Sequence, residues 1–141
     1  MSASDITWQK LVPELSVSDL RASLAFYTEL LGFRILFTRE GFAYLELEDT
    51  QFMLQAASQD SWETGELAFP FGRGINFQIE LGDISPVHSR LVAGGVSLFR
   101  ELQESWYRTG KVLSGQLEFL VQDPDGYLLR FCQFLGERPL S

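Results

Sequence analysis

The stretch VPELSVSDL, residues 12–20, has a near copy in NFQIELGDI, residues 76–84. Each copy alternates apolar and polar side chains and ends in a small residue, an aspartate and an apolar residue. The two aspartates, Asp19 and Asp83, are 64 residues apart. A period of two is typical of a β-strand with one face against a core and the other toward a partly polar space. The sequence therefore predicts an internal repeat in which each unit begins with a strand.

A helix is predicted after each of these aspartates. In the first unit Asp19, or Ser18 before it, is a suitable cap for a helix whose apolar side chains recur every three or four residues, and Gly32 marks its end. In the second unit Asp83 or Ser85 begins an equivalent helix, which a pair of glycines closes. Each unit thus starts as strand and helix.

Three strands are expected after each helix. They cover residues 34–38, 42–47 and 51–55 in the first unit and residues 96–101, 117–122 and 127–134 in the second. The expected fold is α+β, a single domain built from two tandem βαβββ modules, each contributing to a curved mixed sheet around a shared cleft. The first module spans about residues 8–57, a linker about 58–73, and the second module about 74–135.

Two segments without a steady period carry large aromatic side chains. The linker contains Trp62 among glycine, proline and acidic residues, and we expect it to be ordered. Residues 102–116 are expected to form a second long loop, with Trp106 and Tyr107. Aromatic loops on a rigid sheet are common binding surfaces, and the alternative is that these rings enter the core or a dimer contact.

The composition of the chain limits the binding partners and the cellular compartment that we expect. The chain has 141 residues and a net charge of −8, which repels nucleic acid and anionic membranes and attracts cations, although acidity also serves solubility. No apolar run reaches a bilayer span of about 20 residues, and MSASDITWQK lacks the basic segment and apolar core of a signal peptide. A cytoplasmic protein is expected. The single cysteine, Cys132, lies among apolar residues and is predicted to be a buried thiol.

The run VPELSVSDLRASLAFYTELLGF, residues 12–33, its repeat at Asp83 and the ending FLVQDPDGYLLRF, residues 119–131, resemble the vicinal-oxygen-chelate superfamily, and within it the glyoxalase and bleomycin-resistance group. The resemblance covers nearly the whole chain. It implies two modules, each a curved four-stranded sheet with a helix outside, whose concave faces form a shared cavity.

Enzymes of this superfamily hold a divalent metal through His, Glu or Gln at four positions. Carried over to this sequence, those positions are Val12, Leu54, Asn76 and Arg130, with Gln55 replacing Leu54 if that strand slips by one residue. An aliphatic side chain has no lone pair, a guanidinium does not deprotonate, and a lone amide is a weak ligand. The sequence therefore predicts no metal, no cofactor and no metal-dependent enzyme activity.

Other catalytic groups are equally sparse. The only histidine, His88, lies in the second predicted helix and is expected at the surface or in helix packing. Glu14, Glu80 and Glu118 could be imagined as an acid and base pair, but solvated carboxylates at strand ends are more common.

Within the superfamily the chain is most similar to the bleomycin-resistance branch, which implies a homodimer that sequesters a large cationic, aromatic glycopeptide at the subunit interface. Phe37 and Phe42 match aromatic positions of that family's cleft, with core packing as the alternative. The family's aromatic or arginine before the penultimate strand is missing, because Gly115 and Leu117 stand there. The predicted ligand-binding residues are Glu14, Phe37, Phe42, Trp62, Asn76, Trp106, Tyr107 and Arg130.

Two other functions remain open from the sequence. One is a metal-dependent glyoxalase-like lyase or isomerase, or a ring-cleaving dioxygenase. The other is a metal-free module that binds an anion through Arg130 and Arg73. If Arg130 contacts no ligand, we expect it to be structural, in a salt bridge with a neighbour such as Glu14 or Glu80.

Overall fold

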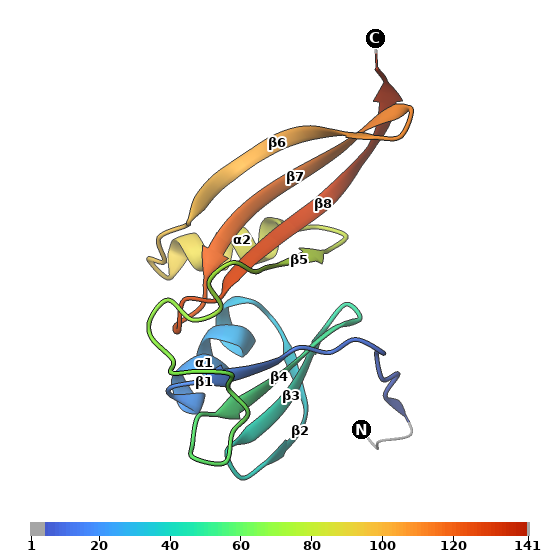
Figure 1. Ribbon diagram of the computed structural model, residues 1–141. Coiled ribbons are helices and arrows are strands. Elements are labelled where there is room, and N and C mark those ends of the chain that lie inside the picture. The colour runs from blue at the N-terminus through green and yellow to red at the C-terminus, as the bar shows by residue number, and fades with distance from the viewer. Residues whose placement is uncertain (1–4, 141) are drawn as a thin grey trace. The chain divides into compact units, whose positions relative to one another are not determined.

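The computed structural model describes residues 5–140, which form two compact units that divide between Phe71 and Gly72. Each unit contains one four-stranded sheet, and the order strand, helix, three strands occurs twice along the chain (Figure 1). The expected α+β fold of tandem βαβββ modules is confirmed. No helix among the described residues is long and apolar enough to span a bilayer.

In the N-terminal unit the three strands after the helix follow the predicted boundaries within one residue, whereas the first strand begins at Glu14, two residues after the start of the quoted repeat. Its elements are β1 (Glu14–Val17), α1 (Leu20–Ala25), the π-helical turn η2 (Phe26–Leu30), β2 (Arg34–Arg39), β3 (Phe42–Leu47) and β4 (Thr50–Ala56). The strand order is β1-β4-β3-β2, with β1 parallel to β4 and the other pairs antiparallel. Sequence alternation fixes these strands because one face of each must meet the helix.

The helix of this unit begins where the sequence predicted. The Oδ1 atom of Asp19 accepts a hydrogen bond of 3.2 Å from the backbone N–H of Ala22, so Asp19 is the cap. The helix widens into the π-turn η2 and ends at Gly32, whose φ of 89° favours glycine. The helix and one sheet face share the core, made of Leu15, Val17, Tyr27, Leu31, Phe33, Leu45, Phe52 and Leu54.

The C-terminal unit has the same plan with longer strands. Its elements are β5 (Asn76–Glu80), α2 (Ser85–Ala93), β6 (Arg100–Thr109), β7 (Val112–Gln122) and β8 (Leu128–Pro139), in the sheet order β5-β8-β7-β6. Asp83 accepts from the N–H of Ser85 at 2.9 Å and so holds the turn before α2, whose N-cap is Ile84. The apolar side chains buried in this unit include Ile79, Leu81, Ile84, Val87, Leu91, Phe119, Val121, Leu129 and Phe131.

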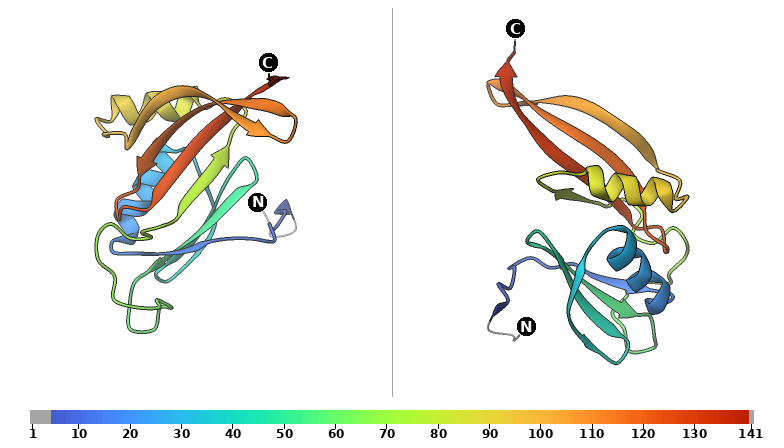
Figure 2. Two further views of the ribbon diagram at one scale, coloured as in Figure 1. Left: turned by 45° about the horizontal axis from the view of Figure 1, so that its top comes forward. Right: turned by 180° about the vertical axis from the view of Figure 1, so that it is seen from behind.

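Residues 102–116 are not a loop, and this prediction was wrong. They form most of a twisted hairpin of β6 and β7 that turns at Gly110 and extends past helix α2 (Figure 2). The expected strand at residues 96–101 begins only at Arg100. The prediction failed because β6 is exposed on both faces and because the pairing of β7 with its two neighbours contains two register shifts. Both features remove the apolar alternation that marks a strand.

The DPDG turn sets the start of β8. Oδ1 of Asp123 accepts from the N–H groups of Asp125 (2.9 Å) and Tyr127 (3.0 Å), while its carbonyl accepts from Gly126 (2.9 Å). Gly126 has a φ of 96°, where glycine is favoured. An aspartate that satisfies two backbone donors makes a rigid turn, so the register of β8, and with it Arg130, is fixed by this turn.

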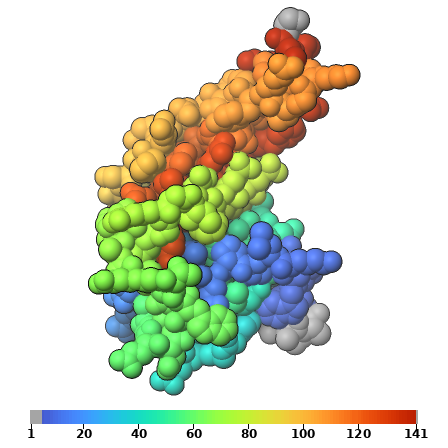
Figure 3. Space-filling view, in the orientation of Figure 1, coloured from blue at the N-terminus to red at the C-terminus, as the bar shows by residue number. Residues whose placement is uncertain are grey.

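The segment that follows β4 contains neither helix nor strand as far as β5. Its part within the N-terminal unit lies on the surface, where it is seen in green in Figure 3. Trp62 in this segment is 91% exposed. Such exposure of the largest side chain leaves it available for a ligand or a partner.

Candidate functional site

Each sheet has one face that its own helix does not cover, here called the open face. In the N-terminal unit the strand pairing places Glu14, Ser16, Arg34, Phe37, Arg39, Phe42, Tyr44, Glu46, Gln51, Met53 and Gln55 on the open face. The set mixes acids, amides, arginines and aromatic rings. Such a face can take part in binding as well as in packing.

The register corrects one predicted position. Leu54 is fully buried on the helix side of β4, so its assignment to the cavity was wrong. Glu14 pairs with Met53 just as Gln78 pairs with Arg130, and Glu14 and Gln78 each precede their aspartate by five residues. Met53 is therefore the counterpart of Arg130. The alignment of the two repeats by sequence was wrong by one residue in β4. Because side chains alternate along a strand, a shift of one residue moves the assigned position to the opposite face.

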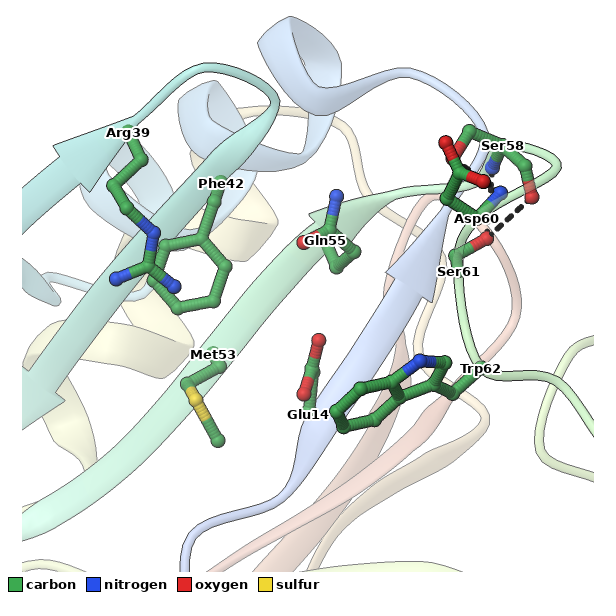
Figure 4. Close-up of a pocket in the computed structure, with 9 residues that line it drawn as sticks. All are labelled: Glu14, Arg39, Phe42, Met53, Gln55, Ser58, Asp60, Ser61 and Trp62. Atoms are coloured by element: carbon green, nitrogen blue, oxygen red, sulfur yellow. Dashed lines mark hydrogen bonds between the residues drawn. The ribbon is translucent and has the colours of Figure 1, made fainter.

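A pocket of about 330 Å³ opens on this face (Figure 4). It is lined by Glu14, Arg39, Phe42, Met53, Gln55, Ser58, Asp60, Ser61 and Trp62. The Phe42 ring is almost fully buried, and the Arg39 Cζ atom lies 4.0 Å from its centroid. Figure 4 shows Glu14 between Met53 and Trp62. Three predicted residues, Glu14, Phe42 and Trp62, thus come together in one pocket.

The loop at the rim of this pocket is held by its own serines. The Ser61 hydroxyl donates to the carbonyl of Ser58 at 2.7 Å, and the Ser58 N–H donates to Ser61 Oγ at 2.8 Å. The carboxylates of Glu14 and Asp60 make no hydrogen bond or ion pair with any residue among 5–140. Two unpaired carboxylates beside aromatic rings favour a cation.

Phe37 lies outside this pocket. Trp8 covers it, with its ring centroid 5.9 Å from that of Phe37 and 5.0 Å from that of Tyr44. The segment before β1 is held by the side chain of Gln51, which accepts from the N–H of Gln9 (2.9 Å) and donates to the carbonyl of Thr7 (2.8 Å). The two phenylalanines that the sequence grouped therefore have different surroundings.

Glu46 is a buried carboxylate at the far end of the same face. Arg34 and the side-chain amide of Gln51 donate to it, the latter at 2.7 Å. The Arg34 hydrogen bond, with that of Gln51, holds the pKa of Glu46 below its ordinary value despite burial, which acts in the opposite direction. Burial and the Glu46 charge raise the pKa of Tyr44. Because its bonds are satisfied within the sheet, Glu46 is structural.

The open face of the C-terminal unit carries a smaller pocket of about 240 Å³. It is lined by Asn76, Arg100, Gln103, Tyr107, Glu118, Leu120 and Arg130. The predicted residues Asn76, Tyr107 and Arg130 therefore meet. Gln103 was not anticipated because the expected strand ended at residue 101, and Arg100 was not anticipated because the sequence does not contain its pairing with Leu120.

Arg130 forms an ion pair with Glu118 and not with Glu14 or Glu80. Arg130 Nε lies 2.9 Å and Nη2 lies 2.8 Å from Oε2 of Glu118, while the hydroxyl of Tyr107 donates to Oε1. Burial raises the pKa of Glu118, but the hydrogen bonds of Tyr107 and Arg130 outweigh burial and lower it. The carboxylate is therefore ionised at neutral pH, and part of the arginine charge is matched.

Trp106 lines neither of the two pockets. Gly115 pairs with it across the hairpin, and a Cβ at Gly115 would lie 2.5 Å from the indole ring. Arg138 Cζ lies 3.8 Å from the ring centroid, and the indole N–H donates to Glu104 at 2.8 Å. The space beside Gly115 is thus occupied by the indole ring of Trp106.

Three further residues discussed from the sequence, His88, Cys132 and Glu80, lie in the C-terminal unit. His88 on α2 meets Phe119 edge to face at 5.2 Å between ring centroids, which confirms the expected helix packing. Cys132 is fully buried, as predicted, and burial, with the charge of Glu80, raises its thiol pKa to about 11. Glu80 itself is exposed.

The four positions that hold metal in enzymes of this fold carry Val12, Met53, Asn76 and Arg130, with the correction at β4. No three His, Cys, Asp or Glu side chains within residues 5–140 are grouped as metal ligands. One thioether, one amide, one aliphatic side chain and a guanidinium do not suit a divalent catalytic ion. The donor set does not fit the metal.

Sequence comparison agrees with the topology. The family profile of the Glyoxalase/Bleomycin resistance protein/Dioxygenase superfamily matches residues 11–131, which include both repeats and the DPDG turn. The chain belongs to this superfamily. The two four-stranded sheets of equivalent strand order agree with this assignment.

Curated superfamily relatives fall into two kinds. The bleomycin resistance protein of Geobacillus stearothermophilus is 27% identical over 132 residues, which cover 86% of this chain and 94% of that protein. A probable lactoylglutathione lyase of Vibrio parahaemolyticus is 30% identical over 128 residues, covering 84% of this chain and 86% of that protein.

Solved superfamily-like structures share the fold. TioX from Micromonospora sp. ML1 has a TM-score of 0.69 at 21% identity, covering 91% of this chain and 100% of that chain. A virulence protein from Salmonella typhimurium has a TM-score of 0.66 at 22% identity, covering 92% of this chain and 99% of that chain. At these identities the likeness concerns the fold alone.

Proposed function

We propose that this superfamily member binds a cationic, aromatic small molecule of the bleomycin type without a metal and without chemistry, as a homodimer with clefts at the subunit interface. One observation carries the proposal. The N-terminal pocket presents two carboxylates, Glu14 and Asp60, that have no partner among the described residues, beside the rings of Phe42 and Trp62.

The chemistry of this pocket suits such a ligand. The carboxylates attract positive charge, and the exposed indole of Trp62 offers a face for an aromatic group, worth on the order of 1 kcal/mol beyond buried area. Arg39 already lies over Phe42, so a ligand ring would stack on Phe42 only after that guanidinium moved. The 27% identity to a bleomycin resistance protein supports the same class of ligand.

The probable lactoylglutathione lyase among the relatives makes a metal-dependent lyase the second candidate function. The residues at the ligand positions oppose it, because Val12 and Arg130 offer no lone pair to a metal. Native mass spectrometry of the protein as purified separates the two. A dimer without a metal increment supports sequestration, whereas one metal ion per chain would favour the lyase.

The proposal is tested by titrating the purified protein with bleomycin while tryptophan fluorescence is recorded. We expect saturable quenching that Trp62→Ala removes and Glu14→Gln weakens, because these changes delete the stacking face and one carboxylate. Glu66→Gln is the matched control, since Glu66 lies in the same segment, is exposed and does not line the pocket.

Both variants change exposed side chains, so their folds should match the parent by circular dichroism. Binding that is unchanged in Trp62→Ala and Glu14→Gln would remove the N-terminal pocket from the proposal. Absence of any binding to the parent protein would overturn the bleomycin-type ligand itself.

A further inference from the structure

Two arginines flank one leucine on the open face of the C-terminal unit. Leu120 on β7 pairs with Arg100 on β6 and with Arg130 on β8, so the three side chains form a row across the sheet. All three line the pocket of about 240 Å³, together with the amide side chains of Asn76 and Gln103. An apolar floor between two guanidinium groups is an arrangement that core packing does not require.

The positive charges of this pocket are only partly neutralised. Glu118 is the one carboxylate that lines it, and that carboxylate is matched by Arg130 and by the hydroxyl of Tyr107. Arg100 is exposed, and its guanidinium makes no hydrogen bond or ion pair with any residue in 5–140. The two guanidiniums and one carboxylate leave one net positive charge in a chain whose own charge is −8.

Hydrogen-bond donors outnumber acceptors in the same space. Arg130 uses only Nε and Nη2 on Glu118, which leaves Nη1 without a partner among the described residues. The Asn76 amide likewise makes no side-chain hydrogen bond within that range. Donors from three strands therefore converge where no protein acceptor completes them.

We infer that this pocket is a binding site for an oxyanion group, a carboxylate or a phosphate carried by a small molecule. Arg100 supplies the free charge, Arg130 a guanidinium held in place by Glu118, and Asn76 an amide donor. The fork of an arginine matches the paired oxygens of either group. The volume of about 240 Å³ exceeds that of such a group, so part of the attached molecule can also lie against Leu120.

The inference goes beyond the proposed function, and its pocket shares no residue with the pocket of Glu14 and Trp62. It also differs from the anion site expected from the sequence. Arg73 does not line the pocket, and Arg100 takes that role. Failure of bleomycin to bind would leave this inference untouched, and the reverse also holds.

The experiment is an NMR titration of the full-length ¹⁵N-labelled protein with inorganic phosphate and, separately, with acetate. Sodium chloride at equal ionic strength is the reference, because it screens charge without offering paired oxygens. We expect saturable shifts of the Nε–H signals of Arg100 and Arg130 and of the Leu120 amide. Saturation by phosphate alone assigns a phosphate group, and saturation by acetate alone assigns a carboxylate.

Arg100→Gln should weaken binding of the saturating anion by tenfold or more, because it removes the free charge and leaves the ion pair of Arg130 intact. Arg108→Gln is the matched control, since it removes an exposed arginine of the same strand that does not line the pocket. Equal affinity in both variants would overturn the inference. Linear shifts with either anion, or shifts no larger than those with chloride, would overturn it as well.

Discussion

Arg130 approaches a single carboxylate oxygen of Glu118 with two of its nitrogens, Nε at 2.9 Å and Nη2 at 2.8 Å, from the neighbouring strand. The Glu118 side chain is 3% exposed and that of Arg130 is 26% exposed. The acid is thus the more deeply buried partner. Loss of the arginine would leave the buried carboxylate of Glu118 without a positive partner and with little access to water.

Arg130→Met should destabilise the protein by about 3 kcal/mol, since removing one partner of a buried pair leaves the other uncompensated. Arg130→Met combined with Glu118→Gln should recover much of that loss, because no buried charge remains. Guanidinium denaturation at pH 7 measures both variants. Additive effects of the two substitutions would contradict the coupling.

Acid should destabilise the fold through Glu46 and Glu118. Both pKa values are lower in the folded protein than the ordinary 4.5, mainly through Arg34 for Glu46, and for Glu118 through Tyr107 and Arg130, which outweigh burial. Near pH 4.5 the unfolded chain therefore binds more protons than the folded protein. The stabilisation is fully present above this pH and is lost as the pH falls through the pKa values of the folded protein.

Denaturation midpoints between pH 7 and pH 3 test this dependence. We expect a flat profile down to about pH 5 and a decline below it. Glu118→Gln should reduce the steepness of the decline, whereas Glu66→Gln, at an exposed carboxylate without a partner among residues 5–140, should keep it. A Glu118→Gln profile as steep as the parent's would show that this carboxylate does not contribute.

The thiol of Cys132 should resist modification in the folded protein. Burial and nearby carboxylates raise its pKa to about 11, so on the order of 0.1% is thiolate at pH 8. Ellman's reagent should label almost no thiol in buffer and about one per chain in guanidinium, since the chain has one cysteine. Rapid labelling in buffer would mean that β8 opens readily.

Gly115→Ala should disturb the hairpin, because a Cβ there would lie 2.5 Å from the indole of Trp106. We expect a loss of about 1–3 kcal/mol and a shift in tryptophan emission as the ring leaves Arg138. Gly65→Ala is the control, since a Cβ at Gly65 has no neighbour within 4 Å. Equal stability and unchanged emission in the two variants would place Trp106 away from Gly115.

Much of the fold could be predicted because alternation and capping act locally. Asp19 caps its helix as expected, and strands β2, β3 and β4 begin and end within a residue of the predicted limits. The β6–β7 hairpin was not predicted because β6 is exposed on both faces and the strand pairing carries register shifts. A strand without a buried face lacks the pattern that prediction uses.

The candidate site could be predicted only where a side chain's face follows from its own strand. Glu14 and Asn76 were placed on open faces by alternation, and the structure agrees. Met53 was missed because pairing between β1 and β4 decides its partner, and the sequence does not contain that register. Arg100 and Arg39 were missed for a similar reason, since only the folded sheet brings them beside Leu120 and Phe42.

Strand β6, which has ten residues, lies at the outer edge of its sheet. On one side it pairs with β7, and on the other side its backbone N–H and C=O groups face no strand of the described chain. Such an edge is a template on which other chains aggregate. Charged side chains at Glu101, Glu104 and Arg108 and the break in register before Gln103 oppose that addition. These features disfavour the addition of a strand from another molecule at the edge of this hairpin.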